Sequence, residues 1–415
     1  MSEKLTVKNV VNINKSTLSA KDNWSTLKYL DTGNITENQI DTLQIFQKGE
    51  KLPSRAKRKV EKGTIIYSTV RPNQKHFGYF DTHSNDLVVS TGFATLDVID
   101  PRINSKYLYY LLTQNSVISQ LQSIGENSTS SYPSIRPEDI GNLSFVFPDI
   151  DIQNKIADIL TSIDKKIQIN NQINQELEAM AKTLYDYWFV QFDFPDQNGK
   201  PYKSSGGKMV YHPELKREIP EGWGVETLKD FESKIITGKT PSRANSDNFG
   251  GEIPFITIGD IRGNTFIYST SETLTDLGAS VQQNKYLPEG SLCVSCIATV
   301  GEIGFTTEWS HTNQQINSIV FEDETNRYYL YFALKNYFEN ANASAKTGNT
   351  FANMNKEDFS GIRIILPRNE IKNNFHKMTE PYFAQIKCLQ GQNQELTQLR
   401  DWLLPMLMNG QVKVE

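Results

Sequence analysis

Apolar residues recur at alternating spacings of four and three along two long segments, a pattern typical of helices that pack along one seam. The first segment covers residues 152–187 and the second covers residues 371–406. Nine of the eleven seam positions are apolar in each, so we expect two long helices that pack on each other. The positions are Ile152, Ile156, Ile159, Ile163, Lys166, Asn170, Ile173, Leu177, Met180, Leu184 and Tyr187, then Ile371, Phe375, Met378, Tyr382, Gln385, Leu389, Gln392, Leu396, Leu399, Leu403 and Met406.

The middle of each predicted seam is polar. Lys166 and Asn170 interrupt the first seam, and Gln385 and Gln392 interrupt the second. Buried polar residues at such positions lower stability but can fix the register and the partner of a helix.

Local signals bound the two helices. Pro148 and Pro367 precede them, with Asp149 or Asp151 and then Asn369 as candidate N-caps. At 1.5 Å per residue the first helix would be about 54 Å long. Pro381 predicts a kink or an interruption of the second helix near Glu380, because proline removes a backbone donor.

The chain contains an internal repeat. PEDIGNLSFVFPDIDIQNKI (137–156) aligns without gaps on KEDFSGIRIILPRNEIKNNF (356–375), at an offset of 219 that also places NQEL (174–177) on NQEL (393–396). Earlier parts match more loosely: YLDTGNI (29–35) resembles FITIGDI (255–261) at an offset of 226, and GTIIYSTV (63–70) resembles GSLCVSCI (290–297) at 227. The helical part therefore keeps its length, as a scaffold does, whereas variable loops are typical of a recognition surface.

The repeat favours a pseudo-two-fold arrangement in which the two helices form an antiparallel coiled coil with one globular domain at either end. The alternative is a pair of unrelated amphipathic helices, each packed on its own domain.

Both globular parts indicate mixed α and β structure, which gives an α+β fold. Short β-rich runs such as TIIYSTV, LVVSTGFATLDVI, IPFITI, SLCVSCIATV and NSIVF alternate with turn residues. Helical segments at 105–123 and 327–343 are each followed by a loop of small polar residues. We therefore expect a first domain over 1–148, a first helix over 149–190, a turn-rich linker over 191–222, a second domain over 223–367, and a second helix with a C-terminal tail over 368–415.

Composition narrows the class of protein. No run approaches the roughly 18–20 apolar residues of a membrane span, and the N-terminus lacks the apolar core of a signal peptide. Three cysteines cannot build a disulfide framework, so we expect a cytoplasmic protein. The net charge of −5 gives no hint of nucleic acid, but residues 48–62 carry seven Lys or Arg against two Glu. Such a run is either a solvated loop or a surface for phosphates.

Candidate catalytic motifs fail on their details. GKT at 238–240 lacks the earlier glycine of a phosphate-binding loop, and Pro241 follows where a helix should begin. Cys293 and Cys296 form a CxxC in a strand-like run, where side chains three apart point to opposite faces, which favours core cysteines over a metal site. The five histidines show no ligand spacing. We also find no glycine-rich loop for S-adenosylmethionine, no methyltransferase tetrapeptide and no convincing acidic metal cluster.

Several stretches, in order, resemble the specificity subunit of type I DNA restriction-modification enzymes over nearly the whole chain. IPEGWGVETLKDF (219–231), TGKTPSR (237–243) and IPFITIGDI (253–261) resemble the usual opening of a target-recognition domain. NQQINSIVF (313–321) resembles an internal strand of these domains. YDYWFVQFDFP (185–195) with GKPYKSSGGKMV (199–210), and LLPMLMNGQV (403–412), resemble the family's link between halves and its C-terminal end. The first domain departs from the pattern, because it has the basic PSRAKRK segment in place of a GKTPS-like opening.

The resemblance implies a subunit with no catalytic activity and no cofactor of its own. It implies two modification subunits that dock along the helices and methylate one adenine in each half-site, and two restriction subunits that can join for translocation and cleavage. S-adenosylmethionine, ATP and Mg²⁺ would then belong to those partners, and the flipped adenine would enter a pocket of the modification subunit.

Residues that match base edges or phosphates are candidates for contacts with double-stranded DNA, since Arg and Lys suit guanine and Asn and Gln suit adenine. They are Arg55, Lys57, Arg58, Lys59, Thr69, Arg71, Asn73, Lys75 and His76 in the first domain, and Lys239, Thr240, Ser242, Arg243, Arg262, Gln314, Gln315, Asn317, Lys346, Thr347 and Asn349 in the second.

We therefore expect a bipartite, non-palindromic site whose halves lie about one turn of the duplex apart, roughly 34–36 Å. Two other functions remain open: a stand-alone DNA-binding regulator, and a coiled-coil scaffold that binds no DNA.

Overall fold

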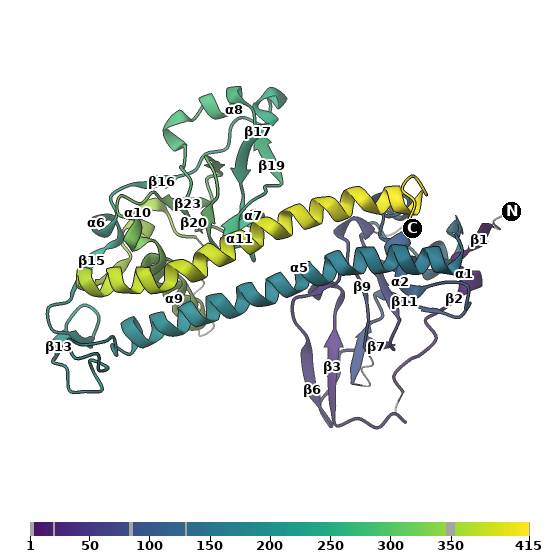
Figure 1. The fold of residues 1–415 in the computed structure, drawn as a ribbon, viewed down its shortest axis with the longest axis horizontal. Coiled ribbons are helices and arrows are strands. Elements are labelled where there is room, and N and C mark those ends of the chain that lie inside the picture. The colour runs from purple at the N-terminus through teal and green to yellow at the C-terminus, as the bar shows by residue number, and fades with distance from the viewer. Residues whose placement is uncertain (1–3, 20, 83–85, 129–130, 346–352, 415) are drawn as a thin grey trace. The chain divides into compact units, whose positions relative to one another are not determined.

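The computed structural model describes residues 4–19, 21–82, 86–128, 131–345 and 353–414. The chain divides into two compact units, one of residues 1–165 with 398–415 and the other of residues 166–397. Each unit holds one globular domain together with parts of two long helices, α5 (Ile150–Tyr185) and α11 (Asn369–Met408) (Figure 1).

The first domain contains two four-stranded sheets. One sheet has the order β2-β11-β8-β9, formed by Val11–Ile13, Phe93–Val98, Ile65–Ser68 and Phe77–Tyr79. The other has the order β6-β3-β10-β7, formed by Gln44–Gln47, Thr26–Leu30, Leu87–Ser90 and Ala56–Lys59. Two small pairs accompany them, β1 (Lys4–Thr6) with β12 (Ser144–Val146) and β4 (Ile35–Thr36) with β5 (Gln39–Ile40). The short helices are α1 (Val7–Val10), α2 (Ser105–Leu112), α3 (Asn115–Glu126) and α4 (Pro137–Gly141).

The second domain contains a five-stranded and a three-stranded sheet. The larger has the order β16-β23-β20-β21-β18, formed by Ile235–Thr237, Ile316–Ile319, Leu292–Ser295, Ile303–Thr306 and Phe266–Ile267. The smaller has the order β19-β17-β22, formed by Glu272–Leu274, Phe249–Ile256 and His311–Thr312. Strand β15 (Gly224–Thr227) pairs with β24 (Arg363–Leu366), and β13 (Met209–His212) with β14 (Arg217–Pro220). The helices are α6 (Leu228–Phe231), α7 (Ile258–Ile261), α8 (Asp276–Ser280), α9 (Arg327–Ala345) and α10 (Lys356–Ser360).

The two domains share one topology, which confirms the internal repeat. Strands β2, β11, β8 and β9 follow the same order as β16, β23, β20 and β21. In the second sheet, β10 lies parallel to β3 as β22 lies parallel to β17. The offset of 219 carries α4 onto α10 and the start of α5 onto the start of α11, while β8 lies 227 residues before β20. The predicted α+β fold is confirmed.

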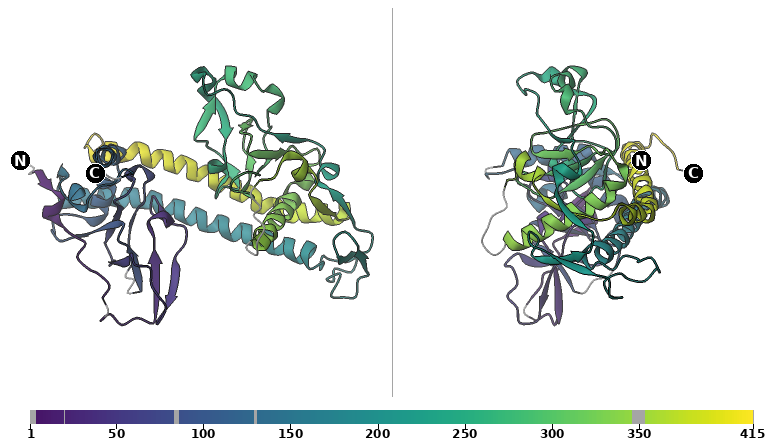
Figure 2. Two further views of the ribbon diagram at one scale, coloured as in Figure 1. Left: turned by 180° about the vertical axis from the view of Figure 1, so that it is seen from behind. Right: turned by 90° about the vertical axis from the view of Figure 1, so that its left-hand side faces the viewer.

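The long helices pack antiparallel within each unit. In the second unit, Asn170 of α5 bonds to Gln392 of α11, while Tyr185, further along α5, meets the earlier residue Phe375 at 6.2 Å between ring centroids. In the first unit Asp164 of α5 lies 3.3 Å from Arg400 of α11. The views in Figures 1 and 2 show the helix portions of each unit side by side.

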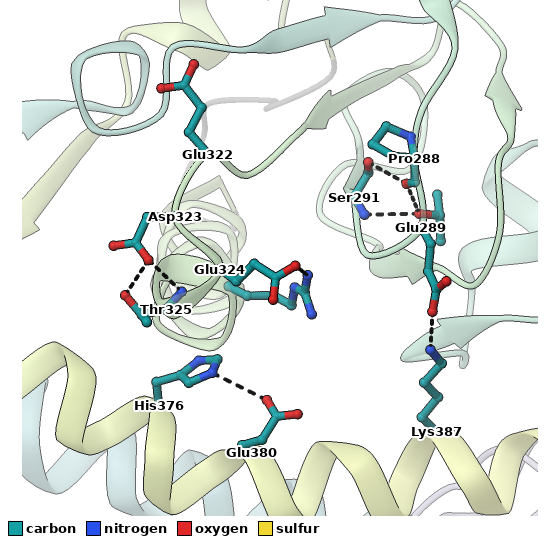
Figure 3. Close-up of polar contacts among 12 residues, drawn as sticks. Pro288, Glu289, Ser291, Glu322, Asp323, Glu324, Thr325, His376, Glu380 and Lys387 are labelled. Atoms are coloured by element: carbon teal, nitrogen blue, oxygen red, sulfur yellow. Dashed lines mark hydrogen bonds and ion pairs between the residues drawn. The ribbon is translucent and has the colours of Figure 1, made fainter.

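Polar contacts join α11 to the domain of the second unit (Figure 3). The ammonium of Lys387 lies 2.5 Å from the carboxylate of Glu289, and that of Lys372 lies 3.2 Å from Asp323. The aromatic rings of Phe383 and Tyr328 are stacked, with 4.0 Å between their centroids. The helix is therefore part of the core of this unit.

The predicted seam is displaced by one residue, which corrects the sequence analysis. In both helices, every position one residue after a predicted seam position is buried or half-buried, whereas several of the predicted apolar positions are exposed. The buried stripe includes Gln153, Asn174 and Glu178 in α5, and Lys372, Thr379 and Arg400 in α11. Because the buried stripe carries so many polar groups, a search for apolar residues finds the adjacent row of positions and not the buried one.

Helix α11 continues through Pro381 without a break, so the predicted interruption is wrong. Phe375 and Phe383, one on each side of the proline, are fully buried in the core of the second unit. Packing on both sides therefore outweighs the loss of one backbone hydrogen bond. Helix α11 begins at Asn369 itself, one residue earlier than it would with Asn369 as its N-cap.

Two other segments differ from their predicted form. The helix expected over 105–123 is two helices, since α2 ends at Leu112 and α3 begins at Asn115. The turn-rich segment 191–222 contains the β13–β14 hairpin and buries Phe192 and Phe194, whose ring stacks on Trp223 at 5.0 Å. That segment is more ordered than its composition predicts. No helix within the described ranges is long and apolar enough to cross a lipid bilayer.

Candidate nucleic-acid interface

The basic segment of the first domain is an edge strand and not the loop that we predicted. Residues 56–59 form β7, which pairs antiparallel with β10 and is covered on its other side by a bridge from Thr17 to Arg58. Strand alternation buries Ala56 and exposes Lys57. In the matching place of the second domain, Leu287 forms an isolated antiparallel bridge with Ser310, so it is the basic strand at this edge that distinguishes the first domain.

The four basic side chains of this segment differ in accessibility. Arg55 and Lys57 are exposed. Lys59 forms an ion pair with Asp22, so it is partly neutralised. Arg58 is half-buried, its Nε has no hydrogen-bond partner among the described residues, and burial lowers the pKa of its guanidinium. Arg55 and Lys57 are therefore the side chains best placed to meet a phosphate or a base.

The segment from Thr69 to His76 forms a tight turn held by backbone contacts. Arg71 and Lys75 flank a short 3-10 helix and both adopt left-handed conformations, with φ of 48° and 56°. Such conformations are uncommon for residues other than glycine and occur often at functional sites. The N–H of Arg71 donates to Pro133 at 2.9 Å, and that of Asn73 to the side chain of Gln122 at 3.2 Å.

Within this turn, three of the residues predicted to contact DNA instead contact other residues of the first domain. The hydroxyl of Thr69 donates to Gly92 at 2.9 Å. Lys75 forms an ion pair with Glu37, and the ring of His76 contacts the carbonyl of Ile35. The side chains of Arg71 and Asn73 are exposed.

A polar loop of the second domain follows β16, the strand that is equivalent to β2 of the first domain. A side chain at Gly238 would place Cβ 2.1 Å from the carbonyl oxygen of Asn313, so this glycine permits a close backbone approach. The hydroxyl of Thr240 donates to the side chain of Gln314 at 2.5 Å, and Lys239 is exposed. The residues directly after Thr240 are not helical, and the next element is a short 3-10 helix at Ser246–Asn248.

Two arginines of the second domain are exposed but paired. Arg243 contacts Glu272 through two hydrogen bonds of 2.8 and 2.7 Å and lies over the ring of Phe249 at 5.1 Å. This guanidinium lowers the pKa of the Glu272 carboxyl. Arg262 lies 3.3 Å from Glu302. These pairs orient each guanidinium, and an exposed pair is weak enough to exchange its carboxylate for a phosphate.

The remaining predicted residues fall into three groups. Ser242 and Gln314 are exposed, while Gln315 is half-buried and accepts a hydrogen bond from Asn313 at 3.2 Å. Asn317 is only 3% exposed and accepts a hydrogen bond from Thr237 at 2.6 Å, so it supports the sheet and is not placed to read a base. Lys346, Thr347 and Asn349 lie outside the described residues.

Sequence reasoning missed two residues beside the candidate surface of the first domain. Tyr132 is exposed, and the guanidinium of Arg71 lies 5.8 Å from its ring centroid. Glu37 forms the ion pair that holds Lys75. Tyr132 could have been predicted, because it is an aromatic residue in a loop of small polar residues. Nothing near Glu37 in the sequence indicates that it pairs with a residue 38 positions away.

The two cysteines of the CxxC sequence are buried core residues, as expected. Cys293 and Cys296 are buried in different hydrophobic clusters, and burial raises their pKa to about 12 and about 11. Within the part of the chain that the structure describes, no group of three or more His, Cys, Asp or Glu side chains is placed to hold a metal ion.

The long helices expose apolar side chains at positions related by the repeat. Ile159 and its equivalent Met378 are 36% and 49% exposed, and Met180 and its equivalent Leu399 are 51% and 43% exposed. Each unit thus carries exposed apolar residues from both helices, Ile159 and Leu399 in the first and Met180 and Met378 in the second.

Comparison with known proteins places the chain in one family. The model of the type I restriction modification DNA specificity domain matches twice, at residues 2–179 and 220–398. The HindI specificity subunit of Haemophilus influenzae is 34% identical, over 92% of this chain and 94% of that protein. The MjaIX specificity subunit of Methanocaldococcus jannaschii is 28% identical, over 93% and 84%. The crystal structure of a type I restriction-modification S subunit from M. genitalium has the same fold, with a TM-score of 0.50 at 14% identity over 98% of this chain and 95% of that one.

Proposed function

The chain belongs to the family of type I restriction-modification DNA specificity proteins, and from this premise we propose that each of its domains reads one half of a bipartite, asymmetric DNA site. As a specificity subunit it recognises DNA, and the catalysis of the system lies in partner subunits.

One observation carries the proposal: two domains of one topology present different polar edges. The first domain carries the basic strand β7 where the second has the isolated bridge between Leu287 and Ser310, and the second domain carries a polar loop after β16, the equivalent of β2. A shared frame with different side chains is the arrangement expected when two domains address DNA in the same way but discriminate different bases. An asymmetric pair of half-sites follows from that difference.

We assign the contacts with DNA to the exposed members of the predicted set. Arg and Lys offer donors to guanine or phosphate, and Asn and Gln can pair with adenine. The remaining members, such as Lys75 and Thr240, hold the readers in place through the contacts described above. The proposed readers are Arg55, Lys57, Arg71 and Asn73 in the first domain and Lys239, Ser242, Arg243, Arg262 and Gln314 in the second, with Lys346, Thr347 and Asn349 retained from the sequence.

We further propose that two modification subunits dock on the exposed apolar residues of the long helices, one for each unit. The support is that the repeat relates exposed Ile159 to exposed Met378, and exposed Met180 to exposed Leu399. These pairs give two near-equivalent apolar surfaces. Two restriction subunits would join the same assembly. In this proposal S-adenosylmethionine, ATP and Mg²⁺ bind to the partners, and the complex acts in the cytoplasm.

Methylation mapping tests the proposed site directly. A host that expresses this chain with its modification partner should carry adenine methylation at one bipartite, non-palindromic motif with an unread spacer. A continuous or palindromic motif would contradict the proposal. Absence of any methylation with a competent partner would favour a DNA-binding regulator or a scaffold.

Salt dependence tests the reader assignment. For the assembled complex, Lys57→Ala should weaken binding to the mapped duplex and reduce the slope of log K against log salt by about 1, since one phosphate contact is lost. The matched control is Lys200→Ala, an exposed lysine of the segment between the repeats, which should leave the slope unchanged. Equal slopes for both variants would remove Lys57 from the interface.

A further inference from the structure

A small hairpin in the first unit lies between the turn of residues 69–76, here called the recognition turn, and the end of α11. Strands β4 and β5 pair Ile35 with Ile40 and Thr36 with Gln39, which leaves Glu37 and Asn38 as a two-residue turn. Both turn residues have positive φ, 46° and 67°. This is the geometry of the turn that best fits the twist of a two-stranded hairpin, so the backbone conformation at Glu37 is well defined.

The hairpin holds the segment that follows the recognition turn. The N–H of Glu37 donates to the carbonyl of Lys75 and that of Asn38 to the carbonyl of Phe77, each at 2.9 Å. The amide oxygen of Asn38 accepts a hydrogen bond from the N–H of Tyr79 at 2.8 Å. The carboxylate of Glu37 also pairs with the ammonium of Lys75, whose backbone is left-handed. Backbone and side chain together fix the C-terminal end of the turn that presents Arg71 and Asn73.

On its other side the hairpin meets Arg400 of α11. The guanidinium of Arg400 lies 3.7 Å from the carboxylate of Glu37, 3.3 Å from that of Asp164 on α5 and 2.9 Å from that of Asp401. The hydroxyl of Tyr110 on α2 donates to Asp164 at 2.6 Å, which orients that carboxylate. All of these residues belong to the first unit.

The burial of Arg400 makes these contacts stronger than ordinary surface ion pairs. Its side chain is 18% exposed, so solvent screens its charge less than that of an exposed arginine. Two cations, Arg400 and Lys75, face three carboxylates, so removing Arg400 would leave Glu37 and Asp164 with too little compensating charge. The hairpin would then lose its attachment to the helices.

We propose that Arg400 is a positioning residue that, through Glu37 and Lys75, fixes the recognition turn of the first domain relative to the helix pair of its own unit. The turn could then present Arg71 and Asn73 only in the conformation that the helices hold. This inference rests on the proposed function, because it assigns a role in reading the first half-site.

The repeat supplies an internal control, because the second unit lacks this device. The residue equivalent to Arg400 by the offset of 219 is Ala181, and the residue equivalent to Asp164 is Phe383; both are fully buried in an apolar cluster. Loss of Arg400 should therefore affect one half-site and spare the other.

The experiment compares half-site discrimination of the full complex. Wild type and Arg400→Met are assembled with the modification subunit, and competition binding measures the preference for the mapped duplex over duplexes scrambled in either half-site. Discrimination against a scrambled first half-site should fall about tenfold, while discrimination at the second half-site stays at the wild-type value. Arg102→Met, which alters an exposed arginine of the same unit, should behave as wild type at both.

Glu37→Gln provides a second route that leaves the buried arginine in place. It should reproduce the selective loss, and the double variant with Arg400→Met should lose no more than either single variant, because both act through one contact. Equal losses at both half-sites, unchanged discrimination in both single variants, or fully additive effects would each overturn the positioning role. If wild type itself shows no sequence preference, the proposed function fails, and that result is distinct from these.

Discussion

At the residue scale, His311 is a buried titratable group of the second unit that has no role in the proposed site. It is fully buried in β22, its ring lies 4.3 Å from that of Tyr286, and neither ring nitrogen has a hydrogen-bond partner among the described residues. Burial lowers the pKa of this imidazole to about 4. The folded chain therefore keeps His311 neutral under conditions in which an unfolded chain would protonate it.

The pKa of His311 predicts acid sensitivity. Because the folded pKa lies below the usual value near 6.5, the stabilisation is complete above pH 6.5 and is lost as the pH falls towards 4. At pH 5 the free energy of unfolding should be lower by about 2 kcal/mol from this group alone. Urea unfolding of wild type and His311→Leu at pH 7 and pH 5 measures this contribution. Between the two pH values, the free energy of unfolding of the variant should fall by about 2 kcal/mol less than that of wild type.

A second histidine variant separates this effect from general acid denaturation. His212→Leu removes a histidine from the β13–β14 hairpin and keeps His311, so its loss of stability at pH 5 should match that of wild type. If His311→Leu loses as much stability as wild type between the two pH values, His311 is not responsible for the acid response.

The candidate readers show what residue-level reasoning from sequence can achieve. Chemical type and position in a turn selected Arg71, Asn73 and Lys239 as candidates, and all three side chains are exposed in the structure. The same criteria selected Asn317, which strand pairing buries, because sequence alone does not reveal which face of β23 is covered. The Glu37–Lys75 pair depends on a contact between separate elements, which no local pattern encodes.

At the element scale, features with a fixed offset were predictable and features that depend on packing were not. The offset of 219 located both long helices, and in the structure it also relates the short helices α4 and α10, which were not predicted. The packed face of α5 and α11 was misassigned by one residue, because each helix packs on a domain as well as on the other helix. The basic strand β7 was expected as a loop, since its pairing with β10 involves residues about 30 positions away.

The polar layer between the helices gives a prediction at this scale. In the second unit the amide of Asn170 donates to the side-chain oxygens of Gln392 and Asn393, both at 2.8 Å, and Asn393 donates to Asn171 at 2.7 Å. Asn170→Ala removes both donors and opens a cavity at a fully buried site. The free energy of unfolding should fall by about 1–3 kcal/mol in chemical denaturation.

An exposed neighbour serves as the control for the polar layer. Gln172→Ala changes an amide two residues away on the outer face of α5 and should alter stability by no more than about 0.5 kcal/mol. Equal effects of the two substitutions would mean that the layer contributes nothing to the pairing of the helices. Buried amides of this kind stabilise one register over its neighbours, which apolar contacts alone discriminate poorly.

At the scale of the whole molecule, the repeat separates what is duplicated from what is not. The strand order and the helix faces recur, whereas the basic strand β7 is replaced in the second unit by an isolated bridge between Leu287 and Ser310, and the position equivalent to Arg400 holds Ala181. The duplicated features are those that would meet two copies of one partner. The features that differ are those that would meet different DNA sequences.

This division predicts how partner binding should respond to single charges on the helices. Ile159→Glu and Met378→Glu each place a carboxylate on one of two repeat-related apolar surfaces, Ile159 in the first unit and Met378 in the second. Burying an unpaired carboxylate in an interface costs several kcal/mol. Each single variant should therefore retain one modification subunit, and the double variant none, as measured by native mass spectrometry of the reconstituted complex.

The control carries the same charge on the same helix away from the apolar stripe: Ala384→Glu alters an exposed residue of α11 and should keep the wild-type stoichiometry. If either single variant lost both copies, the two surfaces would not bind independently. If the double variant kept both, the partner would dock elsewhere. Retention of one copy by each single variant would show that duplication of the scaffold provides two separate docking sites, which is the property a reader of two half-sites needs.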